Sequence, residues 1–442
     1  MTAMTIPTVA GPDTLGDARA TPAVLRKVLT ASFIGNFVEW FDYASYGYFA
    51  TVIAVVFFPE IAPSAALLAT FAVFAISFII RPIGGIVWGS IGDRIGRKTA
   101  LSWSILIMSG ATTLIAFLPG YAQIGFAAPI LLLVLRMVQG FSASGEYAGA
   151  ASFLAEYAPS DKRGFYTSMV PASTAAGLLA GSLMSALLFS LLDTAQLQSW
   201  GWRLPLLLAF PMGLVGLYIR LKLEDTPKFR ELEAQHHVEA TPTRELFTTY
   251  RKPVIRAFGV TCLNAVGFYL ILSYMPTYLI TEMGMDESAS FLANSIALFA
   301  YIFLIFLMGT LSDRFGRKTA LIVASVLFMV LTVPLFGMLD GATFGTIVLI
   351  QVIFGALLTV NDGTLPCFLT EIFPTRVRYS GFAFSFNTAN ALFGGTAPFI
   401  ATWLISITGS KAAPAWFLVG AAVVALIAML SCRETAGKPL ED

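Results

Sequence analysis

The sequence predicts an all-α membrane protein with twelve transmembrane helices in two similar six-helix bundles. Of its 442 residues, 57% are hydrophobic and only 12% are charged, a balance far too apolar for a water-soluble domain. Twelve apolar segments are long enough to cross a bilayer. In addition, two charged motifs of the first half recur in the second half in the same order, which indicates two parallel repeats.

The apolar segments form two groups of six, separated by the longest polar stretch of the chain. That stretch, between Lys222 and Lys252, is charged and helix-compatible, and we interpret it as a linker. The first residues are polar and contain Pro and Gly, unlike a cleavable signal peptide. We expect a tail at 1–25, bundles at 26–223 and 253–432, a linker at 224–252 and a tail at 433–442. The spans are expected near 28–58, 67–91, 99–118, 126–157, 165–190 and 203–223, and near 254–282, 289–311, 319–339, 344–372, 380–408 and 412–432.

Positive charge gives the expected orientation. With both termini inside, nearly all of the 27 Lys and Arg residues lie in the cytoplasmic tails, the short loops and the linker. The positive-inside rule therefore predicts that both termini are cytoplasmic. The exceptions are Arg81 and Arg136 within spans, and Arg203 and Lys411 on the outside.

Several other classes of protein do not fit. The net charge of +1 suggests no nucleic-acid partner. Cys262, Cys367 and Cys432 lie in or beside apolar segments without metal-ligand spacing, so we interpret them as packing residues and expect no metal. The sequence has no nucleotide-binding loop and no nucleophile–base pair. We therefore expect neither an enzyme nor a cofactor; a membrane sensor or membrane enzyme is the alternative from another class.

The repeated motifs lie at the ends of spans. GSIGDRIGRKTAL at 89–101 returns as GTLSDRFGRKTAL at 309–321. FLAEYAPSDKRGF at 153–165 returns as FLTEIFPTRVRYSGF at 368–382. Two parallel repeats joined by a linker predict a substrate site between the halves, near the middle of the bilayer.

The segment 136–165 carries charges inside an apolar span. Arg136, Glu146 and Glu156 are spaced so that on one helix they cover roughly 30 Å, the thickness of a bilayer core. A charge inside lipid is costly and usually faces a bundle interior or a water-filled path. An ion pair at a helix end explains Glu156, but it does not explain Arg136 and Glu146 together. The segment therefore indicates a transport function.

These motifs resemble those of the major facilitator superfamily, whose members share the G-x-x-x-D-R-x-G-R-K loops, the R-x-x-Q-G…E…E-x-x-P helix and LEDTP after the sixth span. GNFVEWFDY (35–43), RPIGG (81–85), SGEYAGA (144–150) and GWRLP (201–205) resemble its metabolite:proton symporter branch. That branch contains proline/betaine, 2-oxoglutarate, citrate and shikimate permeases. The resemblance covers nearly the whole chain after residue 25. It implies a monomeric secondary transporter of a bacterial-type inner membrane, driven by the proton gradient and working by alternating access.

The resemblance also implies gating residues in the loops. In the superfamily the loop acid pairs with basic groups and helix ends, which latches the outward-facing state. Glu156 with Arg163, and Glu371 with Arg376 or Arg378, are the expected complementary pairs. The alternative is that these charges only satisfy topology. The expected gating set is Asp93, Arg94, Arg97, Glu156, Arg163, Asp313, Arg314, Arg317, Glu371 and Arg376.

Proton coupling is expected on carboxylates, because both histidines, at 236 and 237, lie in the linker. Glu39 and Asp42 are three residues apart and share one helix face. Related sugar/proton symporters place an acid here against the arginine that corresponds to Arg136. A static buried ion pair is the alternative, but such pairs are poor stabilisers. The expected coupling residues are Asp42, Glu39, Arg136 and Glu146.

A zwitterion fits the charges better than a tricarboxylate, which would need several cationic groups in the cavity. After the linker no Lys or Arg lies inside a span, and Gln351 occupies the position that matches Arg136. We expect the substrate carboxylate at Arg136 and its ammonium at aromatic faces and Glu39 or Glu146. Any single tyrosine could instead belong to an interfacial belt or to core packing. The expected substrate residues are Arg136, Glu39, Tyr43, Tyr46, Glu146, Asn264, Tyr269, Tyr274 and Asp362.

The sequence thus predicts proton-coupled import of a small organic solute. SGEYAGA is more similar to the proline/betaine members than to the citrate members, which favours proline or glycine betaine. The alternatives are proton symport of a mono-, di- or tricarboxylate, and an uncoupled facilitator or exchanger.

Overall fold

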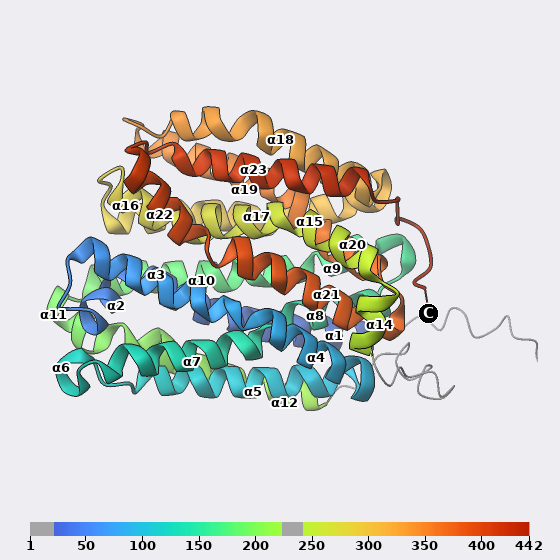
Figure 1. The fold of residues 1–442 in the computed structure, drawn as a ribbon, viewed down its shortest axis with the longest axis horizontal. Helices are drawn as coiled ribbons and strands as arrows, with labels where there is room; N and C mark the ends of the chain where they lie inside the picture. Colours follow the sequence, from blue (N-terminus) through green and yellow to red (C-terminus); the bar gives the residue numbers. More distant parts are fainter. Residues whose placement is uncertain (1–21, 223–241, 442) are drawn as a thin grey trace, which may run out of the picture.

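The computed structural model describes residues 22–222 and 242–441, and these residues form helices, turns and loops without a strand. The helices lie nearly parallel in two stacks (Figure 1). The first half contains α1 (Pro22–Tyr48), α2 (Ala50–Phe57), α3 (Pro63–Ile79), α4 (Arg81–Ile95), α5 (Arg97–Ala116), α6 (Tyr121–Ile124), α7 (Ala127–Ala143), α8 (Glu146–Tyr157), η2 (Ser160–Lys162), α9 (Arg163–Thr167), α10 (Met169–Leu191), α11 (Thr194–Gln196), η3 (Leu197–Gly201) and α12 (Arg203–Leu221).

The second half follows the gap at 223–241, which contains most of the expected linker, so that part of the linker lies outside the described residues. It contains α14 (Pro242–Thr248), α15 (Arg251–Gly267), η4 (Phe268–Tyr274), α16 (Met275–Thr281), α17 (Glu287–Phe315), α18 (Arg317–Gly337), α19 (Phe344–Asp362), α20 (Leu365–Glu371), η5 (Thr375–Val377), α21 (Arg378–Ala389), η6 (Asn390–Gly394), α22 (Ala397–Thr408) and α23 (Ala413–Leu430).

Eleven helical stretches in the described part of the chain are long and apolar enough to cross a membrane. They match the second to twelfth expected spans, often as two consecutive helices, such as α3 with α4 and α7 with α8. The expected first span corresponds to α1 and α2, which are not among the eleven. Polar side chains explain the difference, because α1 carries Asn36, Glu39 and Asp42, all of them buried. The chain is a multi-pass membrane protein.

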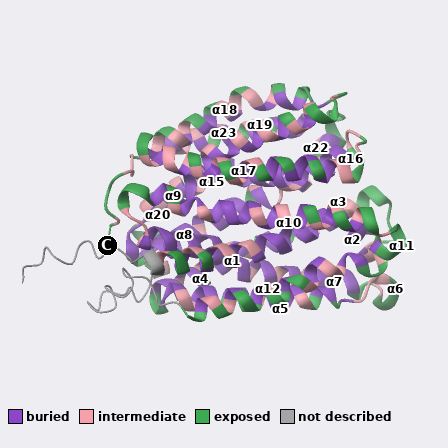
Figure 2. Cartoon of the chain, turned by 180° about the vertical axis from the view of Figure 1, so that it is seen from behind, coloured by how far each residue is buried: buried purple, intermediate pink, exposed green. Residues whose placement is uncertain are grey.

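Buried residues line the middle of the molecule, and exposed ones lie at its ends and periphery (Figure 2). Several apolar residues on the outer helix faces are exposed, such as Ile79, Phe303 and Trp416. Apolar side chains on the outside are expected in a membrane protein, since the hydrocarbon of the bilayer covers them. The halves contact each other through α10 with α17 and through α4 with α21.

The two ends of the molecule differ. We call the end with α14 and residues 432–441 the terminal end, and the end with α2, α6, α11 and α16 the distal end (Figure 1). At the distal end a cavity of about 750 Å³ lies between the halves, lined by α2 and α3 of the first and by α16 and α22 of the second. At the terminal end side chains and backbone groups of the two halves are in direct contact. The halves therefore leave a cavity between them at the distal end, although they also touch near it through the rings of Phe189 and Phe291 (5.8 Å), and they are in direct polar contact at the terminal end.

Candidate functional site

The first latch is a contact of α4 with the start of α21 at the terminal end. Asp93 accepts hydrogen bonds from the backbone N–H groups of Tyr379 (3.3 Å) and Ser380 (2.9 Å) and from the Ser380 hydroxyl (2.7 Å). Because α21 begins at Arg378, these amides belong to its first turn and have no partner within the helix. An acid of one half thus caps a helix of the other, an arrangement that the helix dipole also favours.

The second latch repeats this contact with the halves exchanged. Asp313 of α17 accepts from the backbone N–H groups of Gly164 (2.9 Å) and Phe165 (3.0 Å) in the first turn of α9. The motif glycine that follows each acid is required by the backbone, because Gly96 and Gly316 have φ values of +105° and +97°. The recurring motif therefore makes two equivalent caps across the interface.

A glutamate and two arginines complete each latch. Glu156 pairs with Arg97 (3.3 Å) of its own half and Arg378 (3.0 Å) of the other. In the second latch the corresponding glutamate is Glu371, with Arg317 (3.4 Å) of its own half and Arg163 (2.8 Å) of the other.

The expected pairings of Glu156 with Arg163 and of Glu371 with Arg376 or Arg378 are therefore wrong. Each glutamate instead meets the arginine of the opposite repeat, because the two repeats face each other across the interface. Arg376 contacts α14 instead, where it donates to Tyr250 and lies 3.4 Å from Glu245. Arg94 and Arg314 are exposed and lie outside both latches.

Two glycines let the halves approach closely at the latches. A Cβ atom on Gly89 would lie 2.6 Å from the Ser380 Cα, and one on Gly309 would lie 2.7 Å from the Gly164 carbonyl oxygen. Neither neighbour can rotate away, because both are backbone atoms. These motif glycines thus allow the halves to approach each other this closely.

Farther inside the first half, Asp42 and Arg136 form a buried pair. Arg136 Nη1 lies 3.7 Å from Asp42 Oδ2, and Gln139 joins them by accepting from Arg136 (2.9 Å) and donating to Asp42 (2.7 Å). Gln139 Nε2 also lies 2.7 Å from the Thr112 hydroxyl. Asp42 Oδ1 makes no hydrogen bond within the described residues. The sequence prediction of this pair agrees with the geometry, although its reasoning gave Gln139 no role.

The other expected acids of the first half also face arginines. Glu39 Oε1 lies 3.6 Å from Arg81 Nη2. Glu146 pairs with Arg220 of α12 and accepts from Ser104 (3.2 Å). Glu146 therefore does not share a cluster with Arg136. Sequence reasoning missed Arg220, because nothing local shows that the last turn of α12 reaches α8.

Tyr43 and Tyr46 lie against the two arginines of the core. The guanidinium carbon of Arg136 is 4.1 Å from the Tyr46 ring centroid and 5.0 Å from that of Tyr43. That of Arg81 is 4.7 Å from the Tyr43 centroid. The two tyrosine hydroxyls differ in their hydrogen bonds. Tyr46 donates to the Thr70 carbonyl, whereas Tyr43 makes no hydrogen bond within the described residues.

The second half contributes a carboxylate held by neutral groups. Asp362 accepts from the Asn264 amide (2.8 Å) and the Tyr301 hydroxyl (2.6 Å), and no ion pair to it occurs within the described residues. Tyr274 lies farther toward the distal cavity, which it lines, and its hydroxyl bonds to Thr402 (2.8 Å). Asp362 and Asn264 therefore belong together, while Tyr274 belongs to the distal cavity.

A small central cavity lies between the halves beside Asp362. Its volume is about 10 Å³, and residues from both halves line it. No group of three or more His, Cys, Asp and Glu side chains able to hold a metal occurs in the part of the chain that the structure describes. The lining residues are Trp40, Tyr147, Pro171 and Thr174 of the first half and Asn264, Phe268, Asp362, Phe386 and Asn390 of the second.

Comparison with known proteins gives both a family and a fold. The family model described as "Sugar (and other) transporter" matches residues 27–243 and 230–442. The chain is 39% identical over 426 residues to the glycine betaine/proline/ectoine/pipecolic acid transporter OusA of Dickeya dadantii, covering 94% of this chain and 85% of that protein. It is 37% identical to the proline/betaine transporter of Escherichia coli K12, with the same coverage.

The structural comparison confirms the predicted fold. The proton:xylose symporter XylE of the major facilitator superfamily superimposes with a TM-score of 0.80, covering 95% of this chain and 98% of that chain. A partially occluded inward-open form of XylE from E. coli gives a TM-score of 0.75. The sequence identity is 18% in both cases, so these structures establish the fold alone. The prediction of a transporter rather than an enzyme is also confirmed by the family match.

Proposed function

Because the chain belongs to the sugar (and other) transporter family of the major facilitator superfamily, we propose that it imports a small zwitterion such as proline or glycine betaine together with protons. The names of two relatives, at 39% and 37% identity, supply the substrate class. The core charges agree with it, because cations lie in the first half and a carboxyl group held by neutral side chains lies in the second.

The buried pair of Asp42 and Arg136 is the observation that carries proton coupling. At 3.7 Å the two groups interact without a direct hydrogen bond, and Gln139 bridges them. One carboxylate oxygen remains without a hydrogen bond within the described residues. A carboxylate held this loosely beside an arginine can gain a proton when the pair separates and lose it when the pair forms again. Coupling through Asp42 needs no histidine.

Alternating access follows from the difference between the two ends. If both termini are cytoplasmic, as the distribution of Lys and Arg indicates, the closed terminal end faces the cytoplasm and the distal cavity faces outward. The two latches then form the cytoplasmic gate, and the bundles at 26–223 and 253–432 are the bodies that rock against each other. One chain contains the whole interface between its halves, which supports a monomer as the working unit.

Reconstituted protein tests the proposal. Proteoliposomes with an inwardly directed proton gradient should accumulate labelled proline or glycine betaine, and a protonophore should stop the accumulation. Uptake that is insensitive to the protonophore would instead establish a facilitator or exchanger. A thermal-shift panel with proline, betaines, 2-oxoglutarate, citrate and shikimate identifies the solute first. Stabilisation by citrate alone would refute the zwitterion assignment.

A further inference from the structure

Several buried hydrogen-bond donors converge without a partner where α1 and α4 meet the second half. Within the described residues, Trp40 Nε1, the hydroxyls of Tyr43 and Tyr269, and Nε and Nη2 of Arg81 make no hydrogen bond. Their side chains are neighbours: the Trp40 ring centroid lies 5.8 Å from those of Tyr43 and Tyr269, and Arg81 lies over Tyr43. Leaving such donors unpaired is costly. The donor cluster, Trp40, Tyr43, Arg81 and Tyr269, is therefore suited to an anion with several acceptor positions.

Arg81 is better placed for this role than Arg136. Nε and Nη2 of Arg136 also make no hydrogen bond within the described residues, so position decides between the two arginines. Arg136 is held by Gln139 through Nη1, and its aromatic contacts are Tyr43, Tyr46 and Phe74 of the first half. The guanidinium of Arg81 instead lies 4.1 Å from the Phe78 ring centroid, and that ring lies 5.3 Å from Tyr269 of the second half. Its contact with Glu39, at 3.6 Å, is longer than a hydrogen bond. Arg81 is thus a buried cation at the interface with free donor positions.

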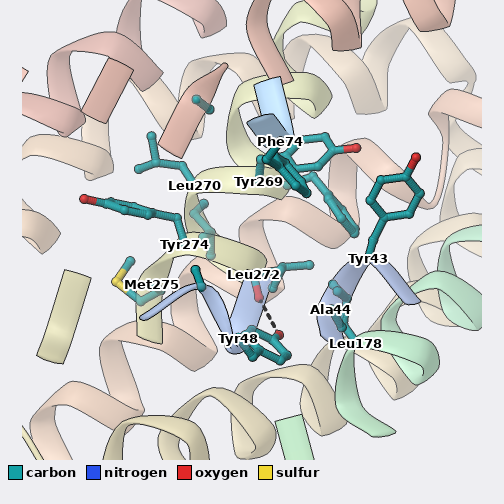
Figure 3. Close-up of a cluster of buried hydrophobic side chains, with 14 of the residues drawn as sticks. Tyr43, Ala44, Tyr48, Phe74, Leu178, Tyr269, Leu270, Leu272, Tyr274 and Met275 are labelled. Atoms are coloured by element: carbon teal, nitrogen blue, oxygen red, sulfur yellow. Dashed lines mark hydrogen bonds between the residues drawn. The ribbon is translucent and has the colours of Figure 1, made fainter. Parts of the chain in front are cut away.

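The aromatic ring of Tyr269 brings the second half into this cluster. Figure 3 shows Tyr269 beside Phe74, with Tyr43 close by on the neighbouring helix. The Tyr269 ring centroid is 6.3 Å from that of Phe74 and 5.6 Å from that of Phe268. An anion bound by Arg81 would therefore touch both halves.

The central cavity beside the donor cluster suits a cation. Four of its lining side chains are aromatic: Trp40, Tyr147, Phe268 and Phe386. Tyr147 and Phe386 stack at 4.5 Å, and Trp40 meets Phe268 edge-on at 4.8 Å. Aromatic faces attract quaternary and protonated amines, and Asp362 adds a carboxyl group to the same wall. Asn264 and Tyr301 hold that carboxyl group in place by hydrogen bonds, and neither of them is a cation.

Trp40 connects the two sites. Its Nε1 belongs to the donor cluster, while its ring lines the central cavity. A ligand that occupied both sites would therefore lie against Trp40 and would carry opposite charges at its two ends.

We propose that the substrate binds across the interface, with its carboxylate on Arg81 and the other donors of the cluster and its ammonium in the aromatic cavity against Asp362. This inference rests on the proposed zwitterion transport. It assigns the carboxylate to Arg81 instead of Arg136, and the ammonium to Asp362 instead of Glu39 or Glu146. Arg81 belongs to the first half and Asp362 to the second, so one bound molecule ties the halves together.

Binding on this route requires movement. A cavity of about 10 Å³ accepts no more than a water molecule, so the Tyr147 and Phe386 rings must part before a ligand enters. These rings come from different halves. The ligand therefore binds a more open arrangement and favours re-closure around its two charges, which links substrate occupancy to the rocking of the bundles.

Equilibrium binding of labelled glycine betaine and proline to purified protein in nanodiscs tests the proposal. Arg81→Lys should weaken binding by about tenfold or more, because an ammonium cannot replace the guanidinium fork. Asp362→Asn should weaken it by a similar factor. Arg203→Lys and Asp340→Asn are the matched controls, since both residues lie at the distal end, and they should bind like wild type.

Competition by half-ligands separates the two sites. Tetramethylammonium should compete through the cavity and lose its effect in Asp362→Asn, while propionate should lose its effect only in Arg81→Lys. If Asp362→Asn does not fold, Tyr147→Leu and Phe386→Leu should give the same loss for the cation. The inference would be overturned, and the proposed function kept, by one result: wild type binds glycine betaine or proline, and Arg81→Lys and the cavity variants bind it with the same affinity. Failure of wild type to bind any zwitterion would overturn the proposed function as well.

Discussion

At the terminal end the two halves present the same residues to each other, whereas in the core they present different ones. Asp93, Arg97 and Glu156 of the first half play the parts that Asp313, Arg317 and Glu371 play in the second. Each acid caps a helix of the opposite half. The symmetry has a physical basis, because a gate between two rocking bodies opens only when both of its sides release.

The core does not have this symmetry. Glu156 and Glu371 are 215 residues apart, and the same offset places Arg136 opposite Gln351, and Tyr147 opposite Asp362. The first half keeps three acid–arginine pairs in its interior, and the second keeps a carboxylate with neutral partners. Under the proposed function, this difference corresponds to a division of roles, with proton handling in the first half and recognition of the ammonium in the second.

The strongest test of this division is Asp42→Asn. The amide keeps the shape of the side chain but cannot exchange a proton, so accumulation of substrate against a gradient should be abolished. Binding and substrate exchange should persist, because the proposed ligand contacts lie at Arg81 and Asp362. The measurements are gradient-driven uptake and counterflow in the same proteoliposomes. Uphill accumulation by Asp42→Asn would move coupling to Glu39 or Glu146.

A second test compares the two latches. Asp93 is the more completely held acid, with three hydrogen bonds across the interface against two for Asp313. Asp93→Asn should therefore open the gate more than Asp313→Asn, and slow turnover by about tenfold with little change in affinity. Cys367, fully buried beside Glu371, reports the opening through its rate of maleimide labelling once Cys262 and Cys432 are replaced by serine. Equal, wild-type labelling in both variants would show that neither acid holds the gate.

The sequence predicted the fold and most members of the latches because these depend on local signals, but Arg94, Arg314 and Arg376 of the expected set lie outside the latches, and Arg378 was not in that set. Apolar span length, repeated motifs and glycines at turns are all visible along the chain. The partners within the latches were not predictable, since Glu156 meets Arg378 only after the halves face each other. Arg220 was not predicted for the same reason, because it reaches Glu146 from a helix that is distant in the sequence. Arg81 was noticed as an intramembrane charge, but its unpaired donors and its closeness to Tyr269 are visible only in three dimensions.

The motif glycines provide a third and smaller test of symmetry. Gly89→Ala and Gly309→Ala each place a methyl group within 2.7 Å of backbone in the other half. Both should keep the halves slightly apart and reduce turnover by a few-fold, to similar extents. Gly337→Ala is the control, because an added Cβ there meets nothing within 4 Å. Cys367 labelling should rise in the first two variants only, and a normal rate in both would contradict the role given to close packing.

The smallest expected effect concerns the C-terminal tail, which contacts both latches. Glu434 of the C-terminal tail accepts from the backbone N–H groups of Arg317 (2.8 Å) and Lys318 (3.0 Å) at the start of α18. The tail also reaches the second latch through Thr435, which donates to Glu371 (2.7 Å), and Lys438, whose carbonyl accepts from Arg163 (3.3 Å). The Glu441 carbonyl accepts from Arg378 of the first latch (3.1 Å). The tail thus braces both latches, and Glu434 acts on the side of the second.

Glu434→Gln should loosen this brace without opening the gate. Partial burial acts to raise the pKa of Glu434, but the backbone donors of Ala436, Arg317 and Lys318 outweigh it and hold that pKa below its ordinary value. The carboxylate therefore stabilises the docked tail at pH values above about 4.3, its ordinary pKa, and the stabilisation disappears as the pH falls through the lowered value. At pH 7 the variant should lose about 0.3–1 kcal/mol of tail docking, seen as faster hydrogen exchange at 434–441, with transport changed less than twofold. As the pH falls through the lowered pKa of Glu434, the exchange rates of the two proteins should converge after correction for intrinsic rates. A difference that persisted unchanged at low pH would mean that the side chain acts by shape, because the charge would by then be gone from wild type as well.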